Sequence, residues 1–263
     1  MKRIYFRSAK AEENKLVYYI GGILVAVLVL GFILNQFVFS KSSPAPTAVS
    51  SPTISPSVSP QPTPLLSPSP IEKSIPNAYL IDNFPFQPQA PFANWDETHD
   101  EACEEASVIL VQWWQSGKSS ISASTMDEEI LKMVDWQIAK WGTHKDLTIQ
   151  ETAEMAENFY GLKLVAQYDV TIEDIKKEIA ENHPIIFPAA GRLLGNPYFR
   201  SPGPIYHMSV IIGYEGNNFI VQDVGTKRGE NYKYNQKVLF NALHDWAGSP
   251  ESIEQGQKAI LIF

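Results

Sequence analysis

The feature that most constrains this chain is a run over residues 16–39 that contains no charged side chain. About 20 consecutive apolar residues are enough to cross the hydrocarbon core of a bilayer as a helix. The run is longer than the roughly 7–15 apolar residues of a secretory signal, and no small-residue cleavage site clearly follows it. We therefore expect an uncleaved transmembrane helix over residues 16–39, which leaves the rest of the chain to fold as separate pieces.

The flanks of this run indicate its orientation. Five lysines and arginines lie in residues 1–15, whereas only Lys41 closely follows the run. Because positive residues are retained on the cytoplasmic side, we expect residues 1–15 to be cytoplasmic and the bulk of the chain to be extracellular. The sequence thus predicts a single-pass protein of the cell membrane, anchored through its own N-terminal helix.

Residues 40–76 change abruptly to serine, proline and threonine, and they hold ten of the 19 prolines. Such a segment lacks the apolar side chains that form a core, and it favours extended, polyproline-like conformations. We interpret it as a disordered stalk. The remaining residues, 77–263, are numerous enough for one domain with a core of its own.

The charge of residues 77–263 limits the partners of this domain. It contains 14 Lys/Arg against 26 Asp/Glu, which leaves a formal charge of −12. A surface this acidic disfavours nucleic acid and anionic lipid headgroups as partners. An exterior domain without disulfides also points to a bacterial surface protein rather than to a small, disulfide-stapled scaffold.

Periodicity and turn signals predict helices first and strands later within the domain. Apolar spacing and capping signals favour helices over residues 100–116, 125–141, 148–161 and 172–181. Runs rich in β-branched residues favour strands over 184–187, 207–214, 219–224 and 258–263. This order predicts an α+β domain with an antiparallel sheet.

Cys103 is the only cysteine, so it forms no internal disulfide, and it stands where the helix over residues 100–116 should begin. Unpaired N–H groups and the helix dipole favour a thiolate at such a place. Taken alone, however, a free cysteine is more typical of a small buried hydrophobe. The acidic neighbours Glu101, Glu104 and Glu105 oppose a thiolate, so catalysis would need a basic partner from elsewhere.

His207 and Asp223 lie on the two arms of one predicted hairpin. Side chains alternate between the faces of a strand, so a loop with an odd number of residues would put both on the same face. A loop of three or five residues satisfies this condition. In such a site the aspartate holds the imidazole in one tautomer while the other ring nitrogen serves the thiol.

The order of a cysteine on an early helix, then a histidine, then an acid on adjacent strands is papain-like, and here the chain resembles the C39-like cysteine peptidase family. The segments that carry the likeness are Gln89-Ala90-Pro91-Phe92-Ala93-Asn94-Trp95, Ala102-Cys103-Glu104-Glu105-Ala106-Ser107, His207-Met208-Ser209-Val210-Ile211-Ile212-Gly213-Tyr214 and Val221-Gln222-Asp223. The resemblance spans most of residues 79–263. It implies a papain-like domain over residues 77–263, with the cysteine on its N-terminal helix and the histidine and aspartate on its sheet.

The resemblance also implies a role for each residue. Cys103 would be the nucleophile, His207 the general base and acid, and Asp223 the residue that orients the histidine. Gln89 would supply an oxyanion-hole donor beside the Cys103 N–H, with Gln87 as the alternative donor. This chemistry needs no cofactor.

Metal and nucleotide sites are not expected. His99, Glu101, Cys103 and Glu104 are possible metal ligands, but their spacing splays them around a helix turn, whereas zinc sites use paired ligands at repeatable spacings. No phosphate-binding glycine loop or dinucleotide fingerprint is present in the sequence. His144 and His183 have no nearby partner in the sequence and are interpreted as surface residues.

Two further features have structural interpretations. The four tryptophans at helical spacing, Trp113, Trp114, Trp136 and Trp141, are expected in the core rather than on a carbohydrate-binding surface. The loop over residues 191–204 precedes His207 and carries Arg192, Tyr198 and Arg200. It either walls the substrate cleft or is an ordinary long connection.

These observations predict an exported, membrane-anchored cysteine peptidase or amidase that cleaves a peptide or amide bond with Cys103, His207 and Asp223. Extracellular peptides, proteins and cell-wall peptides are its expected substrates. An acyltransferase could use the same three residues with a different acceptor. A non-enzymatic alternative is a surface binding module that keeps the fold but has lost activity.

Overall fold

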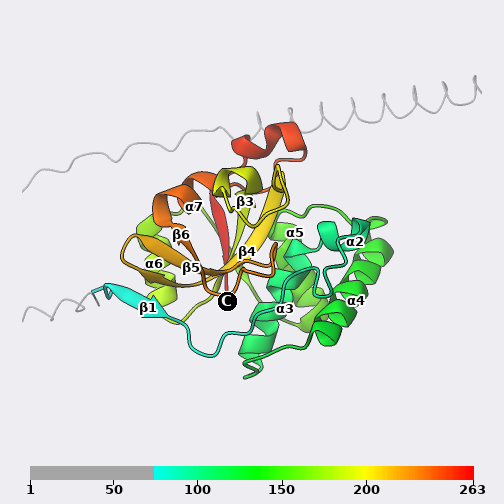
Figure 1. Cartoon of the computed structure of the whole chain (residues 1–263), viewed down its shortest axis with the longest axis horizontal. Helices are drawn as coiled ribbons and strands as arrows, with labels where there is room; N and C mark the ends of the chain where they lie inside the picture. Colours follow the sequence, from blue (N-terminus) through cyan, green and yellow to red (C-terminus); the bar gives the residue numbers. More distant parts are fainter. Residues whose placement is uncertain (1–73) are drawn as a thin grey trace, which may run out of the picture. The chain divides into compact units, whose positions relative to one another are not determined.

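The structure, a computed structural model, describes residues 74–263 of the chain (Figure 1). The expected cytoplasmic segment 1–15 and transmembrane helix 16–39 lie outside the described residues, as does all but the end of the expected stalk 40–76. Helices and strands occur as α2 Glu97–Asp100, α3 Cys103–Gln115, α4 Ala123–Trp141, α5 Ile149–Tyr160, α6 Ile172–Ala180 and α7 Gln236–Ala242, and as β1 Ala78–Leu80, β2 Val165–Tyr168, β3 Ile185–Ala190, β4 Tyr206–Glu215, β5 Asn218–Gln222, β6 Tyr232–Asn235 and β7 Ala259–Ile262. Two 3-10 helices, η1 Gly191–Leu194 and η2 Pro250–Gln255, complete these elements.

The strands form one seven-stranded sheet in the order β2-β7-β3-β4-β5-β6, with β1 paired to the far end of β4. Every pairing in it is antiparallel. The domain is therefore α+β with an antiparallel sheet, as the element order predicts. β3, β4 and β7 are the central strands, and their near-continuous apolar runs are buried on both faces.

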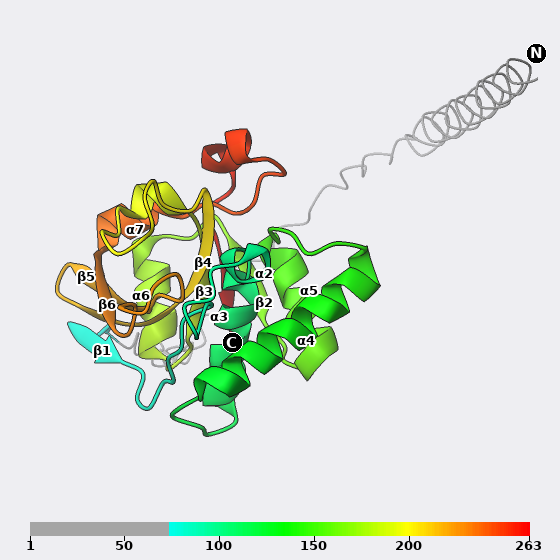
Figure 2. The ribbon, with the colours of Figure 1, turned by 45° about the vertical axis from the view of Figure 1, so that its right-hand side comes forward.

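The helices divide into two groups around the sheet. Figures 1 and 2 show α2, α3, α4 and α5 together on one side, and α6 and α7 with the β4–β6 part of the sheet on the other. Within the first group, α3 packs on β4 and α5 packs on β2 and β7. The nucleophile candidate on α3 is thereby held against the strand that carries His207.

Local sequence signals explain most helix ends. The Thr148–Glu151 capping box forms at the start of α5, and Gly161 ends that helix in the left-handed conformation that glycine adopts without strain. The capping box expected at Thr125 is wrong. The side chain of Ser122 instead accepts a hydrogen bond from the Thr125 N–H, so α4 begins two residues earlier than expected.

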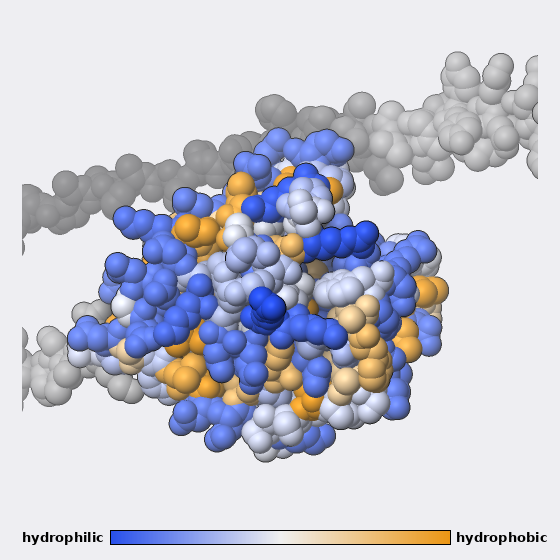
Figure 3. Space-filling model, in the orientation of Figure 1, coloured by the Kyte–Doolittle hydropathy of each residue, from blue (hydrophilic) through white to orange (hydrophobic). Residues whose placement is uncertain are grey.

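The core lies between the sheet and the helices. The four tryptophans pack against it while remaining partly exposed, in agreement with the core interpretation. None of the helices in residues 74–263 combines the length and the apolar character that a bilayer crossing requires. The face shown in Figure 3 is mostly hydrophilic, with apolar side chains in small scattered areas.

The β4–β5 hairpin differs from expectation in a way that matters for the site. Its loop is the even, two-residue turn Gly216–Asn217, because Glu215 pairs with Asn218. A regular ladder from this turn would set Asp223 opposite Val210, on the face away from His207. The register shifts between Ile211 and Gly213, where β4 contains one extra residue. The extra residue has the same effect as a loop with an odd number of residues. It brings Asp223 opposite Ser209, which lies on the same face of β4 as His207.

Candidate active site

Cys103 is the first residue of α3, so this helix begins three residues later than the predicted range 100–116, and Asp100 instead ends the short helix α2. Its N-cap residue, Ala102, makes no side-chain hydrogen bond to the helix. The first N–H groups of a helix have no partner within it, so this end of α3 presents donors and a positive dipole end beside the sulfur. The geometry suits stabilisation of an anion next to Cys103.

The thiol of Cys103 has two close partners. Its sulfur accepts a hydrogen bond from the Met208 N–H at 3.3 Å, which holds it against the peptide that follows His207. The thiol itself donates to Glu104 Oε2 at 3.0 Å. Cys103 is 5% exposed. Burial, followed by the charge and hydrogen bond of Glu104, raises the pKa of Cys103 well above its ordinary value.

His207 is paired with Asp223, with 2.9 Å between Nε2 and Oδ1. Ser209 Oγ, two residues along the same face of β4, lies 3.0 Å from the same ring nitrogen. With two oxygens beside it, Nε2 is the site for the ring proton of a neutral imidazole. No hydrogen bond to Nδ1 occurs within residues 74–263, so this nitrogen remains available as a base.

Asp223 is fully buried and accepts hydrogen bonds on both oxygens. Oδ1 accepts from His207 and from the Gly225 N–H, while Oδ2 accepts from the Tyr234 hydroxyl and from Asn196 Nδ2 at 2.9 Å. Asn196 Nδ2 and the Tyr234 hydroxyl also lie 2.8 Å apart. Burial opposes the charge, but the positive charge of His207 and these hydrogen bonds lower the pKa of Asp223 below its usual value. Asp223 is therefore a carboxylate fixed in one orientation.

The loop that follows Asp223 holds this orientation through two close approaches. Gly229 O accepts from the Asp223 N–H at 2.9 Å, and a Cβ on Gly229 would lie 1.7 Å from Asp223 O. A Cβ on Gly225 would lie 2.8 Å from His207 Cε1 and 2.9 Å from Phe199 Cε1. Only glycine fits at both positions, so the loop closes tightly around the imidazole.

The sulfur and the imidazole are neighbours through the main chain rather than through a direct bond. Among the residues that the structure describes, no hydrogen bond joins Cys103 Sγ to the His207 ring. The thiol proton is directed to Glu104 instead. In the arrangement seen here the thiol is un-ionised, and proton transfer to His207 Nδ1 requires the thiol to turn away from Glu104.

The site has two halves, one on the sheet around His207 and Asp223 and one at the start of α3 around Cys103, and Gln89 connects them. Its backbone N–H donates to Val224 O at 2.8 Å, next to Asp223, while its side-chain Nε2 donates to His99 O at 2.9 Å and Asp100 O at 3.1 Å. Both hydrogens of the amide are therefore directed to the backbone just before Cys103. The alternative donor, Gln87, lies apart and donates to Ile121 O.

A cluster of buried acids surrounds the start of α3. Glu104 Oε1 accepts from the Leu147 N–H at 2.9 Å, and Glu105 accepts from Gln137 and contacts His144 Nε2 at 3.2 Å. Burial and the charges of Glu105 and Asp146 raise the pKa of Glu104. Burial, together with the charge and hydrogen bond of Glu101, raises the pKa of Asp146 to about 7.

His144 corrects one expectation. The sequence suggests a surface residue without a partner, but only 11% of its side chain is exposed and it faces Glu105. Burial opposes its protonation, yet the hydrogen bond and charge of Glu105 raise the pKa of His144 above its ordinary value. His183 also has a partner, since its Nδ1 lies 2.9 Å from Glu178 Oε2.

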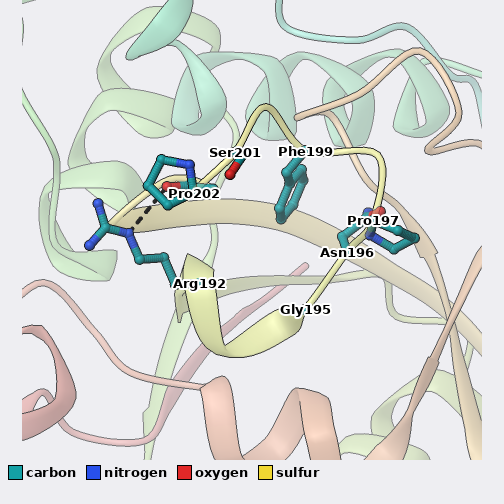
Figure 4. A pocket seen from close by; sticks show the side chains of 8 residues that line it. Arg192, Gly195, Asn196, Pro197, Phe199, Ser201 and Pro202 are labelled. Carbon is teal, nitrogen blue, oxygen red and sulfur yellow. Dashed lines mark hydrogen bonds between the residues drawn. The ribbon is translucent and has the colours of Figure 1, made fainter.

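A pocket of about 300 Å³ lies in the loop before β4, beside the histidine. Arg192, Asn196, Phe199, Ser201 and Pro202 contribute to its lining, and Figure 4 shows their side chains around it. Phe199 packs edge-on against His207, with 5.2 Å between ring centroids, and Asn196 reaches Asp223. The loop over residues 191–204 therefore forms part of the site, which favours the cleft-wall interpretation.

The possible metal ligands near Cys103 do not converge. His99 is instead paired with two aspartates: its Nδ1 lies 2.7 Å from Asp96 Oδ1, and its Nε2 lies 3.1 Å from Asp127 Oδ1. Within residues 74–263, three potential ligand atoms come within 4.8 Å of one another only at Glu178, Glu181 and His183, where Glu181 is exposed and the other two are partly exposed.

Sequence reasoning missed Asn196, Ser209 and Tyr234 as partners of the histidine–aspartate pair. The alternation Tyr232-Lys233-Tyr234 is typical of a short strand and could have indicated a polar tip directed into the sheet. Ser209 lies two residues after His207 and so shares its face. Asn196 has no local signal, because only the path of the loop brings it to Asp223.

The fold and this arrangement define the class of protein as a C39-like, papain-like α+β domain. The chain belongs to the Peptidase_C39 like family, whose sequence profile matches residues 81–249.

Similarity to individual proteins is more remote. A crystal structure of a Bacillus anthracis protein provisionally assigned as a C39-like peptidase aligns with a TM-score of 0.47 at 15% sequence identity. The alignment covers 71% of this chain and 97% of that one. No curated protein matches the chain.

Proposed function

We propose that this protein is a cysteine peptidase or amidase that cleaves a peptide or other amide bond with Cys103, His207 and Asp223. His207 Nδ1 takes the thiol proton, and the sulfur attacks the carbonyl carbon. The oxyanion that forms lies at the N–H groups that open α3. The imidazolium then protonates the leaving amine, which leaves a thioester on Cys103. Water, deprotonated by His207, hydrolyses the thioester and restores the thiol.

The observation that carries this proposal is the hydrogen bond from the Met208 N–H to Cys103 Sγ, across 105 positions of sequence. It holds the only thiol of the described residues against the residue that follows a histidine already paired with a buried carboxylate. Gln89 supports the same interpretation, because it connects the backbone before Cys103 with the backbone after Asp223. Membership of a peptidase-like family adds independent support.

The proposal is tested by incubating the full chain, in detergent, with a peptide library and identifying new termini by mass spectrometry. Wild-type protein should produce cleavages that are absent with Cys103→Ala and with His207→Ala. Asp223→Asn should retain a small part of the rate, because the histidine remains but loses its charged partner. Cleavage that survives Cys103→Ala would contradict the assignment. An added amine that captures the acyl group would instead identify an acyltransferase.

One observation favours the second candidate, a binding module of the same fold without activity. The thiol is buried and donates to Glu104, whose carboxylate opposes thiolate formation. In that case no cleavage would appear between pH 4 and pH 9, and Cys103 would react slowly with iodoacetamide whether or not His207 is present.

We further propose that the domain is exported and tethered to the cell membrane by residues 16–39, and that its substrates are extracellular or cell-wall peptides. The charge-free run and the positive residues before it support this topology. Fractionation and protease treatment of intact cells test it. The full chain should sediment with membranes, and added protease should release the domain while sparing residues 1–15.

A further inference from the structure

The contact between Cys103 and Glu104 stands apart from the papain-like arrangement that the proposed function uses. Neighbouring residues of a helix do not normally face each other, yet Glu104 Oε2 reaches back to within 3.0 Å of the Cys103 sulfur. Its other oxygen is fixed by the Leu147 N–H at 2.9 Å, 43 residues away. With 1% of Glu104 exposed, water does not screen the carboxyl from the thiol.

This pair can carry one negative charge but not two. A carboxylate that accepts the thiol hydrogen stabilises the un-ionised sulfur, and it repels a thiolate at the same distance. A neutral carboxylic acid does the opposite, because its O–H donates a hydrogen bond to the thiolate. The protonation state of one side chain therefore selects between an inert and a reactive sulfur.

We propose that Glu104 is a further catalytic residue of this site, one that holds Cys103 as an unreactive thiol when ionised and stabilises its thiolate when protonated. The sequence of proton transfers is simple. A proton from solvent neutralises the Glu104 carboxylate, the thiol proton passes to His207 Nδ1, and the acid O–H turns to the sulfur. The nucleophile is then the thiolate of an imidazolium pair, with Glu104 neutral. The inference rests on the proposed function only for the role of Cys103 as nucleophile.

The groups that face Glu104 favour its protonation well above the usual range of a carboxyl. Glu105 follows it on α3, Asp146 approaches from the segment before α5, and Tyr206 lies on β4. The tyrosine is neutral and donates its hydroxyl hydrogen to Leu147 O. Burial and the two acids raise the pKa of Glu104 well above its ordinary value. His144 faces Glu105, with 3.2 Å between His144 Nε2 and Glu105 Oε1, rather than Glu104.

Glu104→Gln is a close mimic of the protonated state. The amide oxygen can still accept from the Leu147 N–H, and the amide N–H can donate to the sulfur, so the connection to residue 147 is kept. Glu105→Gln is the matched control, because it also removes a buried negative charge at the start of α3 but one that contacts Gln137 and His144. The sequence contains one cysteine, so every alkylated thiol is that of Cys103.

The experiment measures the iodoacetamide alkylation rate of the full chain in detergent from pH 4.5 to pH 9, for the wild type and both variants. We expect Glu104→Gln to react roughly tenfold or more faster than wild type at pH 8, since each pKa unit changes the thiolate fraction tenfold. The ratio should shrink as the pH falls, because wild-type Glu104 then becomes protonated and resembles the variant. Glu105→Gln should change the rate much less.

Three outcomes would overturn the inference. Equal rates for Glu104→Gln and wild type at every pH would mean that Glu104 has only a structural role, through its hydrogen bond with the Leu147 N–H. Slower alkylation of Glu104→Gln than of wild type would mean that Glu104 promotes the reaction as a base that accepts the thiol proton. Equal acceleration by Glu105→Gln would show a general charge effect instead of a specific contact.

A second measurement is available if Glu104→Gln fails to fold, as judged by circular dichroism. The S–H stretching band of the wild type, isolated as an infrared difference against Cys103→Ser, should be shifted from that of a free thiol and should change as Glu104 titrates. An unshifted band would contradict the thiol–carboxylate contact. Neither measurement needs a substrate, so a failure of peptide cleavage would count against the proposed function and leave the Glu104 result readable.

Discussion

The two halves of the site differ in how completely their buried polar groups are hydrogen-bonded. On the sheet, both oxygens of Asp223 have partners, and His207, Asn196 and Tyr234 are held around them. Beside the start of α3, Glu105 Oε2 and, on α4, Gln137 Oε1 are buried without a hydrogen-bond partner within residues 74–263. An unpaired buried polar group costs about 1–3 kcal/mol, so the helix end is the less stable arrangement of the two.

This difference separates a rigid part of the site from an adjustable one. The histidine and its carboxylate are fixed before any substrate arrives, which is the arrangement that favours proton transfer. The cysteine lies beside Glu104, whose pKa is raised above its ordinary value, and near Asp146, whose pKa is raised to about 7, so its reactivity depends on pH. Substitutions in each half test whether the sheet half is in fact rigid and the helix half adjustable.

The largest effect is expected from Asp223→Ala. It leaves the His207, Asn196 and Tyr234 donors without their acceptor, and unpaired buried groups of this kind cost about 1–3 kcal/mol each. We expect the free energy of unfolding at pH 7 to fall by about 3 kcal/mol or more in urea titrations. Because the pKa of Asp223 is lowered on folding, its contribution is complete above the unfolded pKa near ~3.9 and is lost as the pH falls below it. A deficit that stays constant down to pH 2 would contradict this account.

Gln89→Ala tests the residue that joins the two halves. Both hydrogens of its amide are donated to His99 O and Asp100 O, so donation to the oxyanion requires the amide to turn when substrate binds. In that case kcat for peptide cleavage should fall by about 10²–10³ in Gln89→Ala. The control is Gln87→Ala, which removes an amide whose one hydrogen bond within residues 74–263 goes to Ile121 O, and it should leave kcat nearly unchanged. A kcat within threefold of wild type for Gln89→Ala would limit Gln89 to its hydrogen bonds with His99 and Asp100.

Tyr234→Phe removes one donor from the well-paired half without changing its shape. We expect a loss of about 1–2 kcal/mol in unfolding free energy and a shift of the acidic limb of the activity profile to higher pH, because Asp223 loses a hydrogen bond that favours its charge. Tyr232→Phe is a matched control, since its ring packs 4.7 Å from that of Tyr234 and its phenol has no hydrogen bond within residues 74–263. Identical pH–activity profiles for the two variants would mean that Tyr234 does not position Asp223.

The smallest effect is expected in the acidic half, from Asp146→Asn. Folding raises the pKa of Asp146 to about 7, so the folded state binds more protons than the unfolded state between the two pKa values, and stability falls as the pH rises through that window. The variant should therefore unfold roughly 2–4 °C above wild type at pH 8, the shift that about 1 kcal/mol produces in a domain of this size. The gain should vanish near pH 4. A gain of equal size at both pH values would contradict a raised pKa for Asp146.

The sequence predicts the elements with strong signals and misses those that depend on tertiary contacts. The capping box of α5 follows from local rules, whereas the start of α3 at Cys103 has no side-chain cap and lies three residues after the predicted one. The short strands β1 and β2 have few buried residues, so their pairing is decided by partners far along the chain. Of the site, the hairpin that carries His207 and Asp223 follows from the sequence, but their shared face depends on the bulge in β4, and neither the bulge nor the approach of Asn196 has a signature in the local sequence.

The extra residue in β4 also bears on how such pairs are recognised in other chains. His207 and Asp223 are 16 positions apart here, and the bulge accounts for one of them. A hairpin with the same turn and no bulge would reach an equivalent pairing with one residue fewer. A motif written as a fixed interval will therefore find only one of two geometrically equal forms, whereas a search that counts strand partners will find both.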